Sequence, residues 1–219
     1  MIKVCPSSNP CDESKLLEYA KNLMDLGVEY MHCDVMDGVF VENSCLSFDT
    51  LKNVRDNCNI LLDVHLMVSK VFKTAKKFAE LKPNVITFHY EALKDAKEFS
   101  KTTKMLHKKD ILVGLAIKPN TPIEIVSRLI SYVDLVLIMS VEPGKSGQKF
   151  IESTINKIEI TRDLIKDKNI ILEVDGGINE NNAKQIINAG ADFLVMGKAF
   201  FTSKNKKELL SKIDKHYKN

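Results

Sequence analysis

Residues 111–139 read ILVGLAIKPNTPIEIVSRLISYVDLVLIM, with an apolar segment at each end and an amphipathic segment between them. The first apolar segment starts at Ile111 and the second at Val133. Between them, residues 121–124 (TPIE) have the pattern of a capping box, in which Thr caps free amides, Pro occupies the first helical position and Glu reaches back. One apolar stripe follows at helical spacing: Ile123, Val126, Leu129 and Ile130. The stretch therefore predicts a strand, a helix and a second, parallel strand.

Comparable apolar segments recur along the whole chain and alternate with amphipathic ones. They start near Ile2, Tyr30, Ile60, Val85, Ile111, Val133, Ile170 and Asp192. Asn179 is expected to cap one of the intervening helices, which Gly190 then ends in the left-handed conformation. Strands alternating with helices over 219 residues predict an α/β fold, a single (β/α)8 TIM barrel spanning residues 1–219. An open doubly wound sheet is the alternative, because periodicity does not report whether a sheet closes.

The composition is that of an ordinary globular protein. Thirty-two Lys and Arg against 29 Asp and Glu give a net charge of +3, which argues against a nucleic-acid-binding surface and against disorder. The apolar runs are shorter than the roughly 18 residues that suggest a membrane span, and the first residues lack the apolar segment of a signal peptide. Five cysteines, an odd number without a C-x-x-C pair, predict reduced thiols. We therefore expect a cytoplasmic protein without nucleic-acid or membrane partners.

Polar side chains stand at the ends of three predicted strands. His32 and Asp34 end the second strand, His65 ends the third and Asp175 ends the seventh. Because side chains alternate along a strand, His32 and Asp34 share one face while Cys33 points away from it. The carboxyl ends of barrel strands meet at one mouth, where catalytic groups of this fold lie. Imidazole and carboxylate ligands suit zinc, iron(II), cobalt or manganese, so these four side chains predict a divalent metal site.

Glycines follow the last three predicted strands. The residues concerned are Gly144, Lys145, Ser146 and Gly147 after the sixth strand, Gly176 and Gly177 after the seventh, and Gly197 and Lys198 after the eighth. Glycine permits a close approach of the backbone, and barrels often hold phosphate in the loops after strands seven and eight. Together these loops predict a phosphorylated substrate.

Ordered motifs along nearly the whole chain carry a resemblance to a known family. They are HCDVMDGVFV (32–41), DVHLMV (63–68), TFHYEA (87–92), AIKPNTP (116–122), MSVEPG (139–144), GQKFI (147–151) and EVDGGIN (173–179). In this order they resemble the ribulose-phosphate 3-epimerases of the pentose phosphate pathway. The resemblance implies a TIM barrel of the ribulose-phosphate-binding type and a metal-dependent isomerase that interconverts D-ribulose 5-phosphate and D-xylulose 5-phosphate at C3.

The resemblance also implies roles for individual residues. His32, Asp34, His65 and Asp175 would bind one divalent ion, Zn²⁺ or Fe²⁺, with Co²⁺ or Mn²⁺ as alternatives. Asp34 and Asp175 would form the acid/base pair on opposite faces of the substrate, with a metal-stabilised enediolate between the two proton transfers. Substrate contacts are implied for Ser7, Met36, His65, Met67 and Met139, in addition to the residues of the glycine loops. Family members are often dimers or hexamers, so a homo-oligomer is expected.

Four departures from the family's usual motifs lie at the expected substrate edge. Ser8-Asn9 stands where the family usually has Ile-Leu, Glu42 where it has Pro, Lys145-Ser146 where it has Phe-Gly, and Lys198 where it has Ser. An alternative is therefore a 3-epimerase of a hexulose 6-phosphate such as allulose 6-phosphate. A third possibility, from another functional class, is a non-catalytic barrel that binds a sugar phosphate.

Two features outside the predicted site have simpler interpretations. His89 could be a partner of the metal ligands, but we expect a hydrogen-bonded core histidine. Residues 204–219 are rich in lysine and carry Leu209, Leu210 and Ile213 on one helical stripe. This segment is expected to form a solvated closing helix rather than a nucleic-acid-binding arm.

Overall fold

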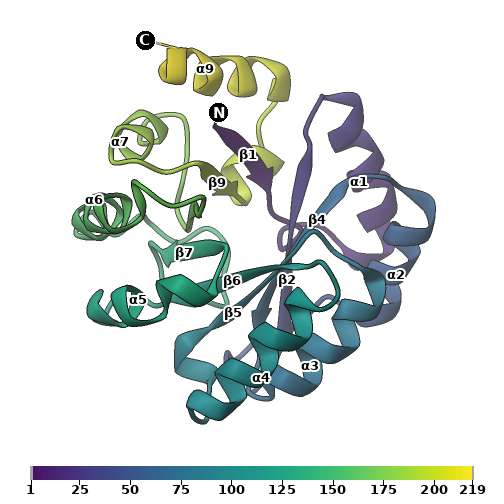
Figure 1. Cartoon of the computed structure of the whole chain (residues 1–219). Helices are drawn as coiled ribbons and strands as arrows, with labels where there is room; N and C mark the ends of the chain where they lie inside the picture. Colours follow the sequence, from purple (N-terminus) through teal and green to yellow (C-terminus); the bar gives the residue numbers. More distant parts are fainter. Residues whose placement is uncertain (1, 219) are drawn as a thin grey trace.

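The computed structural model describes residues 2–218, and the side chains of residues 2–214. Within this range nine strands form one sheet (Figure 1). They are β1 (Lys3–Pro6), β2 (Tyr30–Asp37), β3 (Ser44–Cys45), β4 (Leu61–Met67), β5 (Val85–His89), β6 (Leu112–Ile117), β7 (Leu135–Met139), β8 (Ile171–Asp175) and β9 (Phe193–Met196). The strand order is β1-β9-β8-β7-β6-β5-β4-β2-β3, and every pairing is parallel except that of the short β3 with β2. Eight strands correspond to the eight predicted apolar segments, whereas β3 was not predicted.

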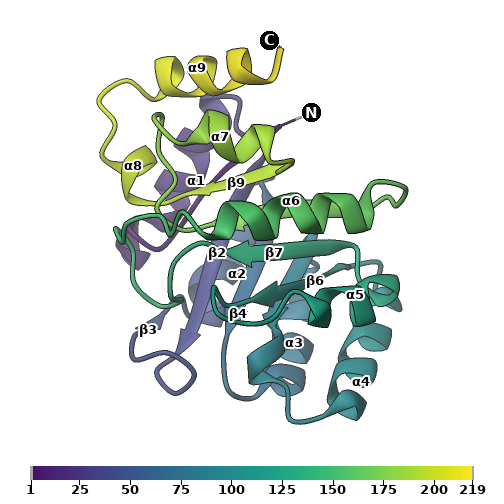
Figure 2. The same ribbon diagram turned by 90° about the vertical axis from the view of Figure 1, so that its left-hand side faces the viewer.

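The helices lie outside the strands (Figures 1 and 2). They are α1 (Leu16–Asp25), α2 (Phe48–Asn57), α3 (Val71–Phe78), α4 (Ala96–His107), α5 (Glu124–Leu129), α6 (Thr154–Ile165), α7 (Ala183–Asn188), α8 (Lys198–Phe201) and α9 (Lys206–Lys218). Single turns of 3₁₀ helix occur at Glu13–Lys15, Ala79–Leu81, Tyr90–Ala92 and Ile130–Tyr132. The predicted closing helix is α9, whose Leu209 and Ile213 are buried. In the described part of the chain no helix is long and apolar enough to cross a membrane.

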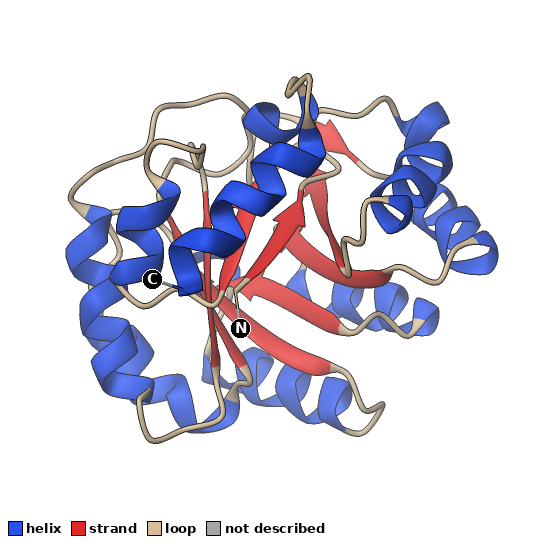
Figure 3. Ribbon diagram, turned by 90° about the horizontal axis from the view of Figure 1, so that it is seen from above, coloured by secondary structure: helices blue, strands red, loops and turns tan. Residues whose placement is uncertain are grey.

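The two ends of the strand order meet at a narrow seam. Ser7, directly after β1, forms a parallel bridge with His32 of β2. The N–H of Ser8 donates to the carbonyl oxygen of His32 over 2.8 Å. The sheet is therefore a barrel, as predicted, and the open doubly wound alternative is wrong. Figure 3 shows helices surrounding the strands when the molecule is seen from above.

Alternation along the strands divides their side chains between two environments. Those that point outward, such as Cys33, Val64 and Leu115, join the main apolar core between the sheet and the helices. The interior of the barrel is apolar on one side, where Leu137 and Met139 of β7 pack together. Its other side is polar, and these interior side chains are completely buried: His32, Asp63, His65, Thr87, His89 and Glu173. The predicted outward direction of Cys33 is confirmed.

Two predicted helix starts differ in detail from the structure. The hydroxyl of Thr121 donates to Glu91 rather than capping α5, which begins at Glu124 without a side-chain cap. The capping-box prediction is therefore wrong: the Thr121 side chain is directed to Glu91 of another loop, and no side chain accepts from the first backbone N–H groups of α5. Asn179 accepts from the N–H of Asn181 over 2.9 Å, which caps the turn before α7 rather than α7 itself.

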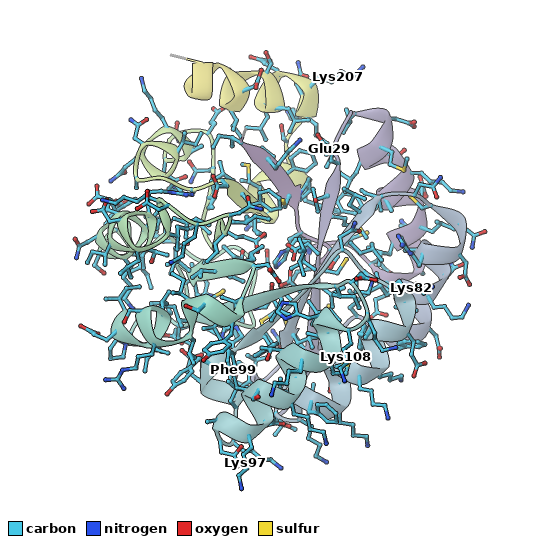
Figure 4. The ribbon with its side chains drawn as sticks, in the orientation of Figure 1. Glu29, Lys82, Lys97, Phe99, Lys108 and Lys207 are labelled. Carbon is cyan, nitrogen blue, oxygen red and sulfur yellow. The ribbon has the colours of Figure 1, made fainter. Side chains whose placement is uncertain are left out.

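Charged side chains lie on the outside of the molecule. Lys97 on α4 and Lys207 on α9 are exposed and point away from the barrel (Figure 4). The five cysteines, all in the described residues, are free thiols. Both observations agree with the interpretation of the lysines as solvated charges and of the cysteines as reduced.

Gly114 of β6 allows the barrel interior to close, and its substitution should destabilise the fold. A Cβ atom at Gly114 would lie 2.1 Å from Oγ1 and 2.8 Å from Cβ of Thr87. Gly114→Ala should therefore lower the free energy of unfolding by about 1–3 kcal/mol, as other overpacked cores do. Chemical denaturation measures the difference, and Gly114→Ala combined with Thr87→Ala should recover part of it. An unchanged midpoint in the single variant would contradict this account.

Candidate active site

Three strands bring the four predicted metal ligands together. His32 and Asp34 lie on β2, His65 lies opposite Asp34 on β4, and Asp175 ends β8. The Nε2 atom of His32 is 3.2 Å from Nδ1 of His65. Oδ1 of Asp34 lies 3.5 Å from the first of these nitrogens and 3.4 Å from the second. Oδ2 of Asp175 lies 4.0 Å from Nδ1 of His65, and one ligand atom from each of the four residues falls within 4.8 Å of the others.

These distances fit a divalent cation. Metal bonds of about 2.0–2.1 Å in tetrahedral geometry place neighbouring ligand atoms about 3.3 Å apart, close to three of the four separations. The donor set of two imidazoles and two carboxylates suits zinc and the neighbouring transition metals. Nδ1 of His32 lies 2.6 Å from Oδ2 of Asp63, so its proton can be donated there. The lone pair of His32 then remains on Nε2, which faces the other ligands.

The two candidate catalytic carboxylates differ in electrostatics. Burial favours the neutral form of Asp34, but His32 and His65 outweigh it and hold the pKa of Asp34 well below its ordinary value. Burial, followed by the negative charge of Asp34, raises the pKa of Asp175 to about 7. Among the protein groups alone, Asp34 is thus ionised at neutral pH while Asp175 is partly protonated.

The two candidate histidine ligands, His32 and His65, also differ in the direction in which their pKa values are shifted. Burial lowers the pKa of His65 to about 4, so its ring is neutral. Burial opposes the charge of His32 as well, but Asp63 and Asp34 outweigh it and raise the pKa of His32 well above its ordinary value. A cation bound at Nε2 requires the neutral ring, so metal and proton compete for this nitrogen.

Asp63 and Glu173 form a second layer of buried carboxyl groups below the ligands. One carboxylate oxygen of Glu173 lies 3.6 Å from Nδ1 of His32, the nitrogen that Asp63 also faces. Burial and the charge of Asp63 raise the pKa of Glu173 well above its ordinary value, so Glu173 is a neutral acid. Neither residue was assigned a role from the sequence, although both lie within the DVHLMV and EVDGGIN motifs, two residues before a candidate ligand.

A cavity of about 240 Å³ opens above the ligands. Asp34 and Asp175 reach its surface, and Ser7, whose hydroxyl donates to Oδ2 of Asp34 over 2.6 Å, lies beside them. Met36, Met67 and Met139 also line it, as predicted from the resemblance. His32 and His65 do not line the cavity; they lie below it and are completely buried.

All the predicted glycine-loop residues line the same cavity. Gly177 has a φ of +66°, and a Cβ atom there would lie 2.3 Å from the backbone nitrogen of Phe150, so only glycine fits. A Cβ atom at Gly147 would lie 3.7 Å from Nζ of Lys198, and one at Gly197 would lie 3.2 Å from Oγ of Ser146. The loops after β7, β8 and β9 therefore converge at one end of the cavity, where the ammonium group of Lys198 also lies.

Lys145 and Lys198, the two lysines that depart from the family's usual motifs, have different surroundings. Nζ of Lys145 lies 3.0 Å from a carboxylate oxygen of Glu42, and both side chains are largely exposed. The neighbouring side chain of Asn43 donates to the carbonyl oxygen of Gly144 over 2.7 Å. The loops after β2 and β7 are thus joined, and the charge of Lys145 is already paired whereas that of Lys198 faces the glycine loops.

Further residues line the cavity that were not predicted as site residues from the sequence. They are Asn9, Val141, Glu142, Gln148, Ile178, Asn179, Val195 and Ala199. Most of them adjoin the quoted motifs, so proximity to a strand end was the available signal. Asn9 had been noted only within a departure from the family's usual motifs, and Asn179 only as a helix cap.

Comparisons with known proteins agree with one another. The model of the ribulose-phosphate 3 epimerase family matches residues 3–201. Two relatives, both named ribulose-phosphate 3-epimerase, come from Buchnera aphidicola subsp. Baizongia pistaciae and Bacillus subtilis. The first is 41% identical to this chain, and the match covers 88% of this chain and 85% of the relative. The second is 33% identical, and the match covers 97% of this chain and 98% of the relative.

Solved structures of other enzymes share the fold. The 3-hexulose-6-phosphate synthase of Salmonella typhimurium aligns with a TM-score of 0.73 at 12% identity, over 99% of this chain and 98% of its own. A structure titled KGPDC from Streptococcus mutans aligns with a TM-score of 0.72 at 10% identity, over 100% and 98%. Identities this low show a common architecture only.

Proposed function

The chain belongs to the ribulose-phosphate 3-epimerase family, and on this basis we propose that it interconverts D-ribulose 5-phosphate and D-xylulose 5-phosphate with one divalent metal ion. It is accordingly an enzyme of the isomerase class. The observation that carries the proposal is the cluster of His32, Asp34, His65 and Asp175 at the floor of a cavity whose far end is built from glycine loops. That arrangement suits a small phosphorylated ketose.

The proposed chemistry moves one proton at C3. This proton is acidic because C3 adjoins the C2 carbonyl, so its removal gives an enediolate. Asp34 and Asp175 project from β2 and β8 into the same cavity, and their different pKa values favour one ionised and one protonated carboxyl group. The ionised group takes the proton from one face of the substrate, and the protonated group returns one to the other face. A divalent ion, when bound, supplies a Lewis acid that polarises the carbonyl and stabilises the developing negative charge.

Buried methionines would shape the reacting end of the cavity. Met36, Met67 and Met139 are each at most 4% exposed. Their apolar, flexible side chains can pack against the carbon skeleton of either epimer and exclude water from the enediolate. Ser7 would hold the carboxylate of Asp34 in place through its hydrogen bond.

The other end of the cavity would bind the phosphate group. Backbone amides of the loops that carry Gly147, Gly177 and Gly197 can approach an anion closely because no Cβ intervenes. Lys198 would add a positive charge at this end.

We also propose that residues 1–219 form one catalytic domain. The identity of the metal as Zn²⁺ or Fe²⁺, the cytoplasmic location and the assembly into a dimer or hexamer remain predictions.

Removal of either carboxylate should abolish the reaction. Asp34→Asn and Asp175→Asn should each lower kcat by about 10²–10⁴-fold, because neither amide can exchange the C3 proton. Turnover of ribulose 5-phosphate and deuterium incorporation at C3 from D₂O measure the two halves of the chemistry. Asp163→Asn, on the exposed face of α6, is the matched control. Substantial turnover by either active-site variant would contradict the acid/base role proposed for that residue.

The two unusual lysines should differ in their effect on substrate binding. Lys198→Ala should raise KM for the ketose phosphate by about 10-fold, since a charge-assisted contact to phosphate is lost. Lys145→Ala should leave KM close to the wild-type value, because the ammonium group of Lys145 already pairs with Glu42. Steady-state kinetics on both variants test this order, and a larger effect at Lys145 would reverse the assignment.

Substrate preference separates the proposal from its nearest alternative. The ratio kcat/KM should be higher for ribulose 5-phosphate than for allulose 6-phosphate, as expected from relatives that are named ribulose-phosphate 3-epimerases. A clear preference for the hexulose phosphate would favour the alternative. Binding of either sugar without any exchange at C3 would instead favour a non-catalytic barrel.

A further inference from the structure

His89 contacts the ring nitrogen of a predicted metal ligand, His65, that is not the one facing the other ligands. Its Nε2 atom lies 2.9 Å from Nε2 of His65, and both rings are completely buried. On its other side, Nδ1 of His89 lies 3.2 Å from a carboxylate oxygen of Glu91. His89 ends β5 and Glu91 lies in the following 3₁₀ turn, so one short segment supplies both groups. His89 is therefore a buried, hydrogen-bonded histidine, as expected, and it also contacts a predicted metal ligand.

The positions of the protons along this chain follow from the donor rules. Nδ1 of His65 faces the other ligands, so it must keep its lone pair if a cation is to bind there. A neutral imidazole has only one N–H, which must then be at Nε2 of His65. This N–H can donate only to an unprotonated Nε2 of His89. The proton of His89 is consequently at Nδ1, and it is donated to Glu91.

Glu91 and His89 are themselves held firmly. The second carboxylate oxygen of Glu91 accepts from the backbone N–H of Lys118 over 2.8 Å and from the hydroxyl of Thr121. The ring of His89 lies between the rings of Phe40 and His65, with centroid distances of 4.9 and 5.0 Å. The loop after β6 thus fixes Glu91, which fixes the orientation of His89.

We propose that His89 and Glu91 are positioning residues that hold His65 in the tautomer and orientation required to bind the divalent ion. Asp63 has the corresponding place behind His32, but there a carboxylate contacts the ligand directly. Behind His65 a neutral imidazole intervenes between ligand and carboxylate. The inference rests on the metal site of the proposed function and assigns no contact with substrate to either residue. Removal of such partners typically weakens metal binding by about 10–100-fold.

Binding of Co²⁺ to the intact chain tests the proposal without reference to activity. His89→Phe keeps the buried ring but removes the acceptor nitrogen, so it should weaken Co²⁺ binding by about 10–100-fold in chelator competition and alter the visible absorption of the bound ion. His89→Gln offers an amide oxygen near the position of Nε2 and should recover most of the affinity. Glu91→Gln keeps the shape but removes the charge, and should have a smaller effect than His89→Phe.

Two control variants separate orientation of His65 from general damage. His107→Phe makes the same substitution at an exposed histidine paired with Asp134 over 2.8 Å, and should bind Co²⁺ like the wild type. Thr87→Val removes a buried hydroxyl from the same strand, one that has no hydrogen-bond partner among the described residues, and should also leave affinity unchanged. Thermal unfolding checks that all variants fold.

The outcomes distinguish this inference from the proposed function. If folded His89→Phe binds Co²⁺ with wild-type affinity, this inference is wrong but the proposed function is not affected. If Glu91→Gln binds Co²⁺ with wild-type affinity, Glu91 is not a positioning residue. Equal loss in His89→Phe and His89→Gln also overturns it, because packing rather than an acceptor would then be required. Failure of the wild-type chain to bind Co²⁺ would instead remove the metal from the proposed function.

Discussion

The hydrogen bond between His32 and Asp63 is the interaction on which the interior of the barrel depends. Six ionisable side chains are almost completely buried there: His32, Asp34, Asp63, His65, His89 and Glu173. A buried charge is tolerated only when it is paired, and the 2.6 Å contact pairs the two groups at the centre of the set. It also turns Nε2 of His32 towards Asp34 and His65. The same hydrogen bond therefore pairs the buried charges and orients His32 in the candidate site.

Strand periodicity carried most of what could be read from the sequence. It located the eight parallel strands, and alternation within the second one correctly separated Cys33 from His32 and Asp34. Convergence of side chains at the strand ends followed from the barrel alone. The register between neighbouring strands, which sets Asp34 opposite His65, is decided by packing across the sheet and has no local signal. For the same reason the sequence named His89 as one possible partner of the metal ligands but could not place it against His65.

The loops show where local reasoning fails. Thr121 has a good capping sequence, yet its hydroxyl contacts Glu91, which is thirty residues away along the chain. Glu42 and Lys145 looked like separate departures at the substrate edge, but they face each other and form one ion pair. Ser8 supports β2 by accepting from the N–H of Asp34 over 3.2 Å. Fewer of the departures therefore bear directly on the substrate than the sequence suggested.

The seam at Ser7 and His32 joins the candidate active site to the closure of the sheet. Elsewhere neighbouring strands are joined by continuous ladders, whereas here one bridge and the adjoining hydrogen bond complete the circle. Both flanking residues also belong to the candidate site, since Ser7 contacts Asp34 and His32 faces the other ligands. Local opening of a fold is easiest where the fewest hydrogen bonds must break. The shortest pairing of the closed sheet thus lies beside the candidate site, and the geometry of that site depends on the barrel remaining closed.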